Sequence, residues 1–425
     1  MAMEYSPREV DRQLEKLLVL LPAVAVEGAK GVGKTASVER IAGEIFSLDQ
    51  ESTFLNVVAD PELILKGTAP IFIDEWQRVP SVWDVVRRAV DRGATSGTFV
   101  LAGSASPSQK TAIHSGAGRI VRVMMRPMTI PERRIEQPTV SFANLLAGDA
   151  SDMVQGRTDV ATHDYVEEIL ASGFPGIRSQ QAEARPYLLD GYLERIVDRD
   201  IPEAGATVRR PVALRNWLAA YGAATATAAT DATIFRAASP SGNPVNKQTA
   251  ASYRELLQRI WVLDPVPAWE PGFAHLKRLG QASKHHLVDP ALAARLVGAT
   301  AGSLIKGVGD PDFPRDGTFL GALFESLVVQ TVRVLAESCG ASIAHIRTRD
   351  GDHEVDIIVQ RPDFRVLAIE VKMSTAVKPS DVTQLNWLEQ QLPNRLIDKV
   401  IINAGSRAFR RPDGVAVVPL GLLGP

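Results

Sequence analysis

The first stretch whose residue types could do chemistry is a glycine-rich loop near the amino terminus. Its residues fit the pattern G-x-x-x-x-G-K-T and are Gly28, Ala29, Lys30, Gly31, Val32, Gly33, Lys34 and Thr35. Glycines let a backbone wrap closely around phosphate oxygens and aim its N–H groups at them. Lys34 would reach the β- and γ-phosphates of ATP, and the Thr35 hydroxyl would bind Mg²⁺. The loop therefore predicts a site for ATP and Mg²⁺, the alternative being a chance glycine turn before a helix.

A pair of acidic residues, Asp74 and Glu75, ends the apolar run Ile71–Ile73. Asp74 would hold the water shell of Mg²⁺, and Glu75 would polarise the attacking water. An apolar strand that ends in two acids is common, but downstream of the loop it must lie beside the loop's own strand to deliver Asp74. Ser104 ends the next apolar run, Phe99–Gly103, and is placed to contact the γ-phosphate or the attacking water. A simple turn serine at a strand end is the alternative interpretation.

A second set of charged residues lies near the carboxyl end. Glu325 falls on an expected helix, Asp356 on an expected strand, and Glu370 and Lys372 at the end of the next strand. Strand residues two apart share a face, so Glu370 and Lys372 point the same way. Asp356 and Glu370 could converge on a second Mg²⁺, and Lys372 could orient a water for metal-assisted phosphodiester hydrolysis. The alternative is a fold that has lost this chemistry and binds DNA or a protein partner.

The region between these two sets carries an excess of basic residues. From 205 to 260 there are two acidic residues, Asp231 and Glu255, and seven basic ones: Arg209, Arg210, Arg215, Arg236, Lys247, Arg254 and Arg259. Such a face could follow the phosphates of DNA. A solvated arginine-rich helix, or a module for protein contacts, is the alternative. The neighbouring pair His285 and His286 has no further ligands at zinc-binding spacing, and we interpret it as structural.

The glycine-rich loop needs a strand before it and a helix after it, and the chain around it supplies both. The expected strands are Ala23–Val26, Thr53–Val57, Pro70–Asp74 and Thr98–Ala102, and the expected helices include Val10–Leu20, Lys34–Phe46 and Val82–Arg92. This alternation predicts a parallel sheet with helices on its faces, which is an α/β domain.

The carboxyl-terminal charged residues fall on a second group of elements. The expected order is a helix (Phe319–Glu337), three strands (Ser342–Arg347, Glu354–Gln360 and Val366–Val371), a helix (Ser380–Gln391) and a strand (Lys399–Asn403). Helices and loops dominate the chain between the two groups. We therefore expect three domains, over residues 1–145, 146–280 and 281–425, with α/β, helical and α/β character.

The motifs resemble those of a prokaryotic branch of the AAA-type P-loop ATPases. The resemblance rests on Ile73–Pro80, Leu101–Ser104, Ser115–Arg119 and Arg126–Thr129. It implies the parallel sheet of a P-loop NTPase. It also implies that Arg119 is an arginine finger or a sensor of the γ-phosphate, acting within its own subunit or across a subunit boundary. Arg78 is a weaker candidate for a contact with a neighbouring subunit.

In that branch, two further regions follow the ATPase domain. The first is a winged-helix-like region, and the resemblance places one of its helices near Lys247. The second is a domain of unknown function that is similar to the PD-(D/E)xK nucleases and implies a restriction-endonuclease-like α/β fold. Glu325 matches the helical acid that this superfamily often adds, and Gln384 matches an accessory polar residue on the following helix.

The composition is that of a soluble globular protein. Of the 425 residues, 45% are hydrophobic and 23% are charged, and a net charge of -2 gives no electrostatic case for a dedicated nucleic-acid binder. Pro22 interrupts the apolar run Leu17–Val26, which is also too short to span a membrane. The single cysteine, Cys339, excludes an intrachain disulfide. We expect a cytoplasmic protein with no membrane partner, and a homo-oligomer is compatible with the sequence.

These observations predict an ATP-hydrolysing protein that requires Mg²⁺. Its nucleotide state would be coupled to a DNA-directed, nuclease-like carboxyl-terminal domain. The alternative is a nucleotide-switched regulatory or partner-binding protein whose nuclease-like domain is catalytically inactive.

Overall fold

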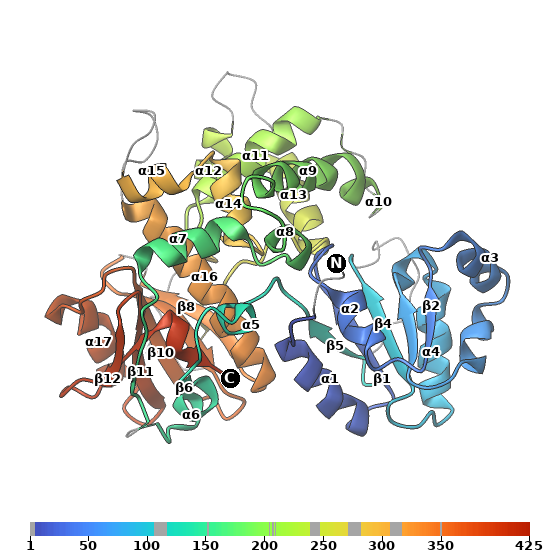
Figure 1. The fold of residues 1–425 in the computed structure, drawn as a ribbon, viewed down its shortest axis with the longest axis horizontal. Coiled ribbons are helices and arrows are strands. Elements are labelled where there is room, and N and C mark those ends of the chain that lie inside the picture. Colours follow the sequence, from blue (N-terminus) through green and yellow to red (C-terminus); the bar gives the residue numbers. More distant parts are fainter. Residues whose placement is uncertain are drawn as a thin grey trace.

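The chain folds into two large sheets joined by a helical region, with a further two-stranded sheet (Figure 1). The computed structural model describes residues 5–105, 117–150, 153–203, 205, 208, 210–238, 247–270, 282–306, 317–348 and 351–425. Ser115 and Arg209, named above, lie outside these ranges. The amino-terminal sheet and the carboxyl-terminal sheet lie at opposite ends of the view in Figure 1, and the helices lie along one side of both. The predicted mixed α/β class is confirmed.

Five parallel strands form the amino-terminal sheet, in the order β2-β3-β4-β1-β5. They are β1 (Ala23–Glu27), β2 (Glu44–Ser47), β3 (Ile71–Asp74), β4 (Phe99–Gly103) and β5 (Val121–Met124). Every residue of β1, β3 and β4 is buried, as expected for central strands covered on both faces. Because the strands are parallel, the residues that follow β1, β3 and β4 meet at one edge of the sheet.

Two local predictions in this domain are wrong. Its helices are α1 (Glu9–Leu20), α2 (Lys34–Glu39), α3 (Glu51–Ala59) and α4 (Ser81–Asp91). The predicted strand Thr53–Val57 lies within α3, and the predicted helix Lys34–Phe46 stops at Glu39, before β2. In β2, an edge strand, only Phe46 is buried, so it lacks the continuous apolar run of a central strand. The sequence patterns also predict no strand at β5, where Arg122 interrupts the apolar residues.

Short helices and turns dominate the region after the first sheet. They are α5 (Ile130–Arg133), α6 (Phe142–Ala147), α7 (Thr162–Ala171), α8 (Pro175–Arg178), α9 (Arg185–Arg195), α10 (Ile201–Glu203), α11 (Pro211–Ala223), α12 (Asp231–Ala237) and α13 (Lys247–Arg259). A π-helical turn, Ile196–Asp200, joins α9 to α10. Such turns inside helices are frequent at functional sites.

An antiparallel pair of extended segments follows α13, and we call it the ribbon. It consists of residues 262–268 and 284–288, with bridges from Leu263 to Leu287 and from Val266 to Lys284. The helices α14 (Pro290–Leu296) and α15 (Ala301–Lys306) come next. Helix α14 packs against α7, α9 and α11, so the ribbon and these two helices lie with the middle region in space.

The carboxyl-terminal sheet is mixed and has the order β7-β12-β13-β11-β10-β9-β8. Its strands are β7 (Gly156–Arg157), β8 (Ser342–Arg347), β9 (Glu354–Gln360), β10 (Val366–Lys372), β11 (Leu396–Asn403), β12 (Arg407–Arg410) and β13 (Ala416–Pro419). A 3₁₀ turn, Pro379–Val382, leads into the helix α17 (Thr383–Gln391). The predicted order of helix, three strands, helix and strand is therefore confirmed.

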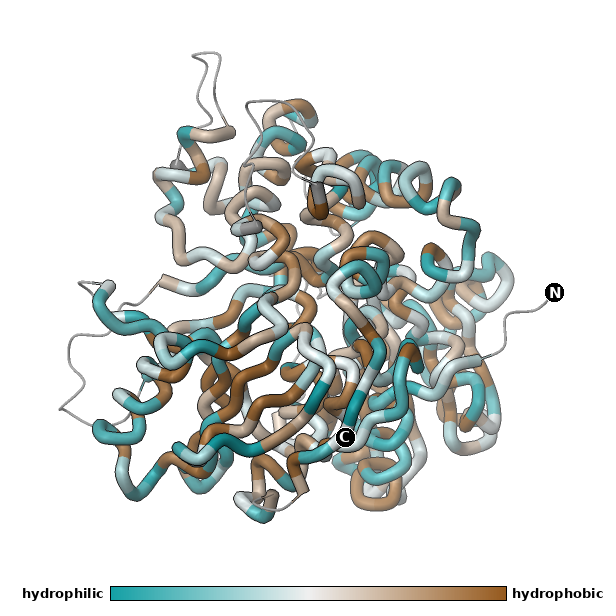
Figure 2. The backbone as a smooth tube through the Cα atoms, turned by 60° about the vertical axis from the view of Figure 1, so that its left-hand side comes forward, coloured by the Kyte–Doolittle hydropathy of each residue, from teal (hydrophilic) through white to brown (hydrophobic). Residues whose placement is uncertain are grey.

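The long helix α16, Gly317–Ser338, packs against this sheet and the middle helices. Among the described residues, its segment Thr318–Ser338 is the one helix long and apolar enough to cross a membrane. However, 78% of its apolar window is buried inside the protein, as in the core helix of a globular domain. Figure 2 shows hydrophobic residues gathered along the strands and hydrophilic residues on many of the outer turns.

The chain crosses between domains more than once. The strand β6 (Val140–Ser141) pairs with β14 (Leu423–Gly424) at the carboxyl terminus, and β7 pairs with β12. The segment that leaves the amino-terminal sheet is thus part of the carboxyl-terminal domain in space.

Candidate functional site

The glycine-rich loop leaves the end of β1 and wraps tightly against the chain that follows β5. An added Cβ on Gly28 would lie 2.1 Å from the carbonyl oxygen of Met125, so only glycine fits there. Gly33 has a φ of 103° immediately before α2, a conformation that glycine adopts without steric cost. The backbone thus supports the loop shape predicted from the glycine spacing.

The two residues predicted to act on the phosphates and on Mg²⁺ lie at the start of α2. The ammonium of Lys34 is buried and donates to the carbonyl oxygens of Gly28 and Ala29, at 2.8 and 2.9 Å. The hydroxyl of Thr35 donates to Oδ2 of Asp74 at 2.8 Å. The carboxyl ends of β1 and β3 therefore bring together a hydroxyl and a carboxylate, the oxygen ligands that Mg²⁺ prefers.

Glu75 and Ser104 form a second polar contact at the same edge. The hydroxyl of Ser104 donates to Oε2 of Glu75 at 3.0 Å, and the amide of Gln77 donates to both side chains. Glu75 has a φ of 53°, a region that costs a non-glycine residue on the order of 1 kcal/mol or more. The sequence motifs identified Glu75 and Ser104, whereas Gln77, two residues after Glu75, was not among the predicted site residues.

Burial changes the proton affinity of the central charged groups. It lowers the pKa of Lys34 to about 8, against the opposing effect of Glu75 and Asp74. Burial also raises the pKa of Asp74 to about 6, although the hydrogen bond from Thr35 acts in the opposite direction. A cation bound between the carboxylate and the phosphates would favour the charged form of Asp74.

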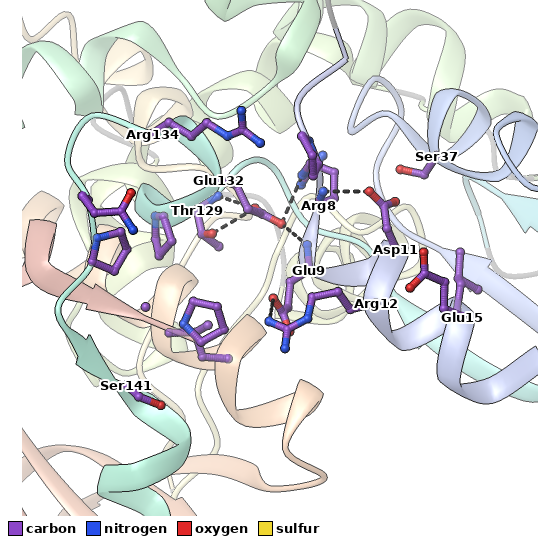
Figure 3. Close-up of a pocket in the computed structure, with 18 of the residues that line it drawn as sticks. Arg8, Glu9, Asp11, Arg12, Glu15, Ser37, Thr129, Glu132, Arg134 and Ser141 are labelled. Carbon is purple, nitrogen blue, oxygen red and sulfur yellow. Dashed lines mark hydrogen bonds and ion pairs between the residues drawn. The ribbon is translucent and has the colours of Figure 1, made fainter. Parts of the chain in front are cut away.

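The amino-terminal segment contacts the loop through the side chain of Arg8. The guanidinium of Arg8 donates to the carbonyl oxygens of Val32, in the loop, and Arg126, after β5, at 2.8 and 2.6 Å. It also pairs with Glu132 at 3.2 Å, and Glu132 accepts from the backbone N–H groups of Glu9 and Thr129. Figure 3 shows this network in the wall of a cavity of about 840 Å³ between α1 and the chain leading to the carboxyl-terminal domain.

A second cavity, of about 650 Å³, opens beside the start of α2. It is lined by Tyr5, Ser6, Arg8, Gly33, Ala36, Glu39, Arg40, Met128, Pro175, Arg178 and Ser179. The guanidinium of Arg40 lies over the ring of Tyr5, 4.3 Å from its centre. The cavity adjoins the loop at Gly33.

The middle region reaches over the loop from the other side. The ammonium of Lys30 donates to Asp200 and Glu203, at 2.7 and 2.6 Å. The hydroxyl of Tyr192 donates to the carbonyl oxygen of Lys30 at 3.1 Å. The π-helical turn Ile196–Asp200 carries Asp200 to this point. Sequence reasoning identified Lys30 only as a loop residue and missed its carboxylate partners.

Arg119 lies away from the phosphate-binding edge of its own domain. It precedes β5, and because β1 and β5 are parallel in register, it lies near the amino end of β1. Its guanidinium pairs with Asp91, at the end of α4, at 2.6 Å. Arg78 is exposed and lies over the ring of Phe54. The structure therefore does not bring Arg119 to the loop of the same chain.

The predicted carboxyl-terminal residues do come together, with an unpredicted lysine among them. Lys284, from the ribbon, donates to Glu325 and Asp356, and its ammonium also pairs with Glu354, each at 2.9 Å. Asp356 accepts the backbone N–H of Val371 through its other oxygen, at 2.9 Å. A lysine at the start of the short extended segment 284–288 was the available signal for this contact.

The last two predicted residues, Glu370 and Lys372, pair with each other at 2.9 Å. The second oxygen of Glu370 is buried and has no hydrogen-bond partner among the described residues. Burial raises the pKa of Glu370 to about 8, and Asp356 adds to this effect. Burial alone would raise the pKa of Asp356, but Lys284 and Lys372 hold it below its ordinary value.

The accessory residues have other partners. Gln384 bonds to the ring of His353 at 2.9 Å, and His353 stacks on Trp387. His285 bonds to the carbonyl oxygen of Ala229, and His286 bonds to Ser326. Within the described ranges, no three histidine, cysteine or acidic side chains are grouped as metal ligands would be.

The basic residues of the middle region do not form one uninterrupted face. Arg254, on α13, pairs with Asp231 at the start of α12, and Arg215 pairs with Asp198. Arg210 and Arg236 are exposed. The exposed positions on α13 include Gln248, Ala251, Ser252 and Glu255, so this helix presents a polar face with few positive charges.

An ion cluster around the buried Arg126 joins all three parts of the chain. Arg126, after β5, pairs with Asp264 of the ribbon and Glu337 of α16, both at 2.6 Å. Arg333 of α16 pairs with the same Asp264. Removing one partner of such a buried network typically costs several kcal/mol, since it leaves a charge without compensation.

Comparisons with known proteins match three separate parts of the chain. Residues 21–133 match an AAA domain, residues 162–303 match a domain of unknown function (DUF8612), and residues 320–423 match another (DUF4143). The amino-terminal domain is therefore an AAA-type ATPase domain, which implies nucleotide binding and ATPase activity in general. The second match ends after α14, in agreement with the packing of that helix against the middle region.

Whole-chain relatives are distant. Uncharacterized proteins of Mycobacterium tuberculosis (Rv2008c) and Mycobacterium bovis (Mb2031c) are each 25% identical over 422 residues, covering 97% of this chain and 83% of the relative. Among solved structures, a Walker-type ATPase of Pyrococcus abyssi shares 14% identity, covers 69% of this chain and 96% of its own, and has a TM-score of 0.41.

Proposed function

We propose that this protein hydrolyses ATP in a Mg²⁺-dependent reaction at the loop Gly28–Thr35. The observation that carries the proposal is the 2.8 Å contact between Thr35 and Asp74, which joins the ends of β1 and β3 beside the buried Lys34. Thr35 and Asp74 would hold the ion, which neutralises phosphate charge when it is bound.

The remaining residues of this edge have separate roles in the proposal. Lys34 exchanges its two carbonyl partners for phosphate oxygens. Glu75 orients and polarises the attacking water, and Ser104 and Gln77 hold the Glu75 carboxylate in place. The cavity between Tyr5 and Pro175 receives the base and ribose. The contacts of Lys30 with Asp200 and Glu203 then transmit the nucleotide state to the middle region.

The test is the rate of phosphate release from ATP by the purified chain, with Mg²⁺ and with EDTA. Mg²⁺-dependent turnover that is lost in Lys34→Ala supports the proposal. Turnover that persists in Lys34→Ala, or that is unchanged by EDTA, contradicts it. The same assay with single-stranded, duplex and supercoiled DNA measures whether nucleic acid stimulates hydrolysis.

A DNA-directed role for the rest of the chain is the second candidate. Two arrangements favour it: helices α11, α12 and α13 are followed by the ribbon, as in a winged helix, and α16 to β11 follow the element order of the PD-(D/E)xK nucleases. Asp356, Glu370 and Lys372 fall on the corresponding strands. The rival is a nucleotide-switched protein whose carboxyl-terminal domain binds a partner without cleaving DNA.

Two measurements separate these roles. Nicking of a supercoiled plasmid with Mg²⁺ or Mn²⁺, lost in Lys372→Ala, supports nuclease chemistry. Binding to a fluorescent duplex between 50 and 200 mM salt should weaken steeply if phosphates are contacted, on the order of 1,000-fold for six contacts. Arg210→Ala and Arg236→Ala should weaken it, with Arg12→Ala as the control. Absence of nicking and of binding favours the partner-binding role.

A further inference from the structure

Lys284, on the ribbon, is deeply buried against the carboxyl-terminal domain, and its surroundings are unusual for a lysine. Only 2% of its side chain is exposed, and its ammonium lies 2.9 Å from each of Glu325, Glu354 and Asp356. Two of its N–H donors are used by Glu325 on α16 and Asp356 on β9, and Glu354 forms an ion pair with the same ammonium. A single positive charge thus faces three acidic groups.

The acidic cluster contains a further carboxylate, Glu370, in addition to the three that contact Lys284. The second carboxylate oxygen of Glu370 is buried, and among the described residues it has no hydrogen-bond partner. Glu370 shares β10 with Lys372 and has an electrostatic interaction with both Asp356 and Lys284. Oxygen ligands from three elements, one of them unsatisfied, would suit Mg²⁺ or Mn²⁺ better than a single ammonium.

Lys284 does not belong to the elements that supply the acids. It comes from the ribbon, where its backbone exchanges hydrogen bonds with Val266 at 2.9 and 3.0 Å. Asp264, on the same ribbon strand as Val266, is held by Arg126 of the ATPase domain and by Arg333 of α16. The ribbon is thus attached at one point to the ATPase domain and at another to the acidic cluster.

We propose that Lys284 is a tethered cation that fills the acidic cluster of the carboxyl-terminal domain and excludes a divalent metal ion. The cluster of Glu325, Glu354, Asp356 and Glu370 binds Mn²⁺ or Mg²⁺ only when the ribbon withdraws the lysine. The expectation of a freely accessible second Mg²⁺ site at Asp356 and Glu370 is thereby replaced by a site that the ribbon keeps closed. This inference does not depend on ATP hydrolysis, since it concerns different residues.

The experiment is a Mn²⁺ titration followed by thermal unfolding, in full-length protein that carries Lys34→Ala to weaken binding at the loop. In that parent, Mn²⁺ should not change the Tm by more than it does in the same parent with Asp356→Asn added. Addition of Lys284→Met should lower the Tm in EDTA by at least about 5 °C, because the buried acids lose their counter-charge. Mn²⁺ should then restore at least half of that loss, and Asp356→Asn should remove the restoration.

A matched control is available in the same sheet. Lys399 is also buried, 6% exposed, and pairs with a single carboxylate, Glu389, at 2.7 Å. Lys399→Met should lower the Tm without creating any response to Mn²⁺. If Lys284→Met does not fold, the variant Lys284→Met with Glu325→Gln, which removes the lysine and one acid together, replaces it in the titration.

Three results would overturn the proposal. The first is a Tm increase with Mn²⁺ in the parent that Asp356→Asn abolishes, because the lysine would then not exclude the metal. The second is a folded Lys284→Met protein that does not respond to Mn²⁺. The third is failure of both lysine variants to fold even when Mn²⁺ is present during refolding. Plasmid nicking that appears only in the folded lysine variant would support the proposal and identify the domain as a closed nuclease.

Discussion

At the scale of single residues, the phosphate-binding edge depends on a few groups with distinct tasks. Lys34 supplies positive charge, and Glu75 supplies a carboxylate held by Ser104. Lys34→Ala should reduce ATP hydrolysis by about 100-fold or more, because it removes charge stabilisation from the transferred phosphate. Glu75→Gln should still bind ATP while hydrolysing it slowly. Steady-state phosphate release and filter binding of labelled ATP measure the two effects, and Lys66→Ala, at an exposed lysine of the same domain, is the control.

The protonation of Asp74 gives a second prediction. Its pKa is raised to about 6, so the fold disfavours the charged carboxylate. The contribution of this group to stability is therefore greatest below pH 4 and is lost as the pH rises through 6. Asp74→Asn should raise the Tm of the nucleotide-free protein at pH 7.5 by about 2–4 °C, and the gain should shrink below pH 6.

The same substitution should also abolish hydrolysis, which separates stability from function. Wild-type hydrolysis at saturating Mg²⁺ and ATP should fall only at a pH below 6, since the bound cation favours the charged form of Asp74. Asp60→Asn, at an exposed aspartate, should change neither property. A lower Tm in Asp74→Asn at pH 7.5 would show that the carboxylate stabilises the fold, contrary to this account.

Residues of the ATP site were largely predictable, whereas their partners were not. The spacing of Gly28, Gly33, Lys34 and Thr35 is local, so a linear pattern contains it. The contact of Lys284 with Asp356 joins residues 72 positions apart, and that of Lys30 with Asp200 joins residues 170 apart. Nothing in a linear pattern fixes which carboxylate a distant lysine will meet, because the topology decides it.

At the scale of elements, central strands were predictable and edge elements were not. β1, β3 and β4 are continuous apolar runs, which only a buried strand explains in this context. β2 follows a short helix, and the apolar residues of both can be read as one helical pattern. The available signal was Gly43, where an added Cβ would lie 2.6 Å from the carbonyl oxygen of Ala69. The β-branched residues near Thr53 favoured a strand, but the segment forms α3.

The contact of Lys30 with the π-helical turn and α10 gives a third prediction. Asp200 and Glu203 hold the middle region to the loop through Lys30. Asp200→Asn with Glu203→Gln should speed the release of a fluorescent ADP about fivefold, as expected for the loss of about 1 kcal/mol. Stopped-flow fluorescence measures this rate. Arg199→Met is the control, because it breaks only the exposed pair with Glu203. Unchanged release in the double variant would mean that the contact does not restrain the nucleotide.

At the scale of the whole molecule, ion pairs and strand pairings connect the three parts of the chain. Arg126 fixes the ribbon and α16 to the ATPase domain, while β6 and β7 place the connecting chain in the carboxyl-terminal domain. The loop contacts the middle region at Asp200, and the ATPase domain contacts the ribbon at Arg126.

If Arg119 is an arginine finger, its position predicts that hydrolysis requires more than one subunit. Within its own chain it pairs with Asp91, near the end of the sheet opposite to the loop. If it acts as a finger in trans, Arg119→Ala should retain ATP binding, and hydrolysis should fall about 1,000-fold. The specific activity of the wild type should also decrease on dilution.

Mixing two inactive variants provides the decisive version of this test. Lys34→Ala has an intact Arg119, and Arg119→Ala has an intact loop. In a mixed assembly, some loops of the second variant would face an arginine of the first, so the mixture should hydrolyse ATP faster than either protein alone. Arg78→Ala, which alters another exposed arginine of the domain, distinguishes the two candidate fingers. No gain on mixing, together with full wild-type activity from a monomer at every dilution, would place all the catalytic groups within one chain.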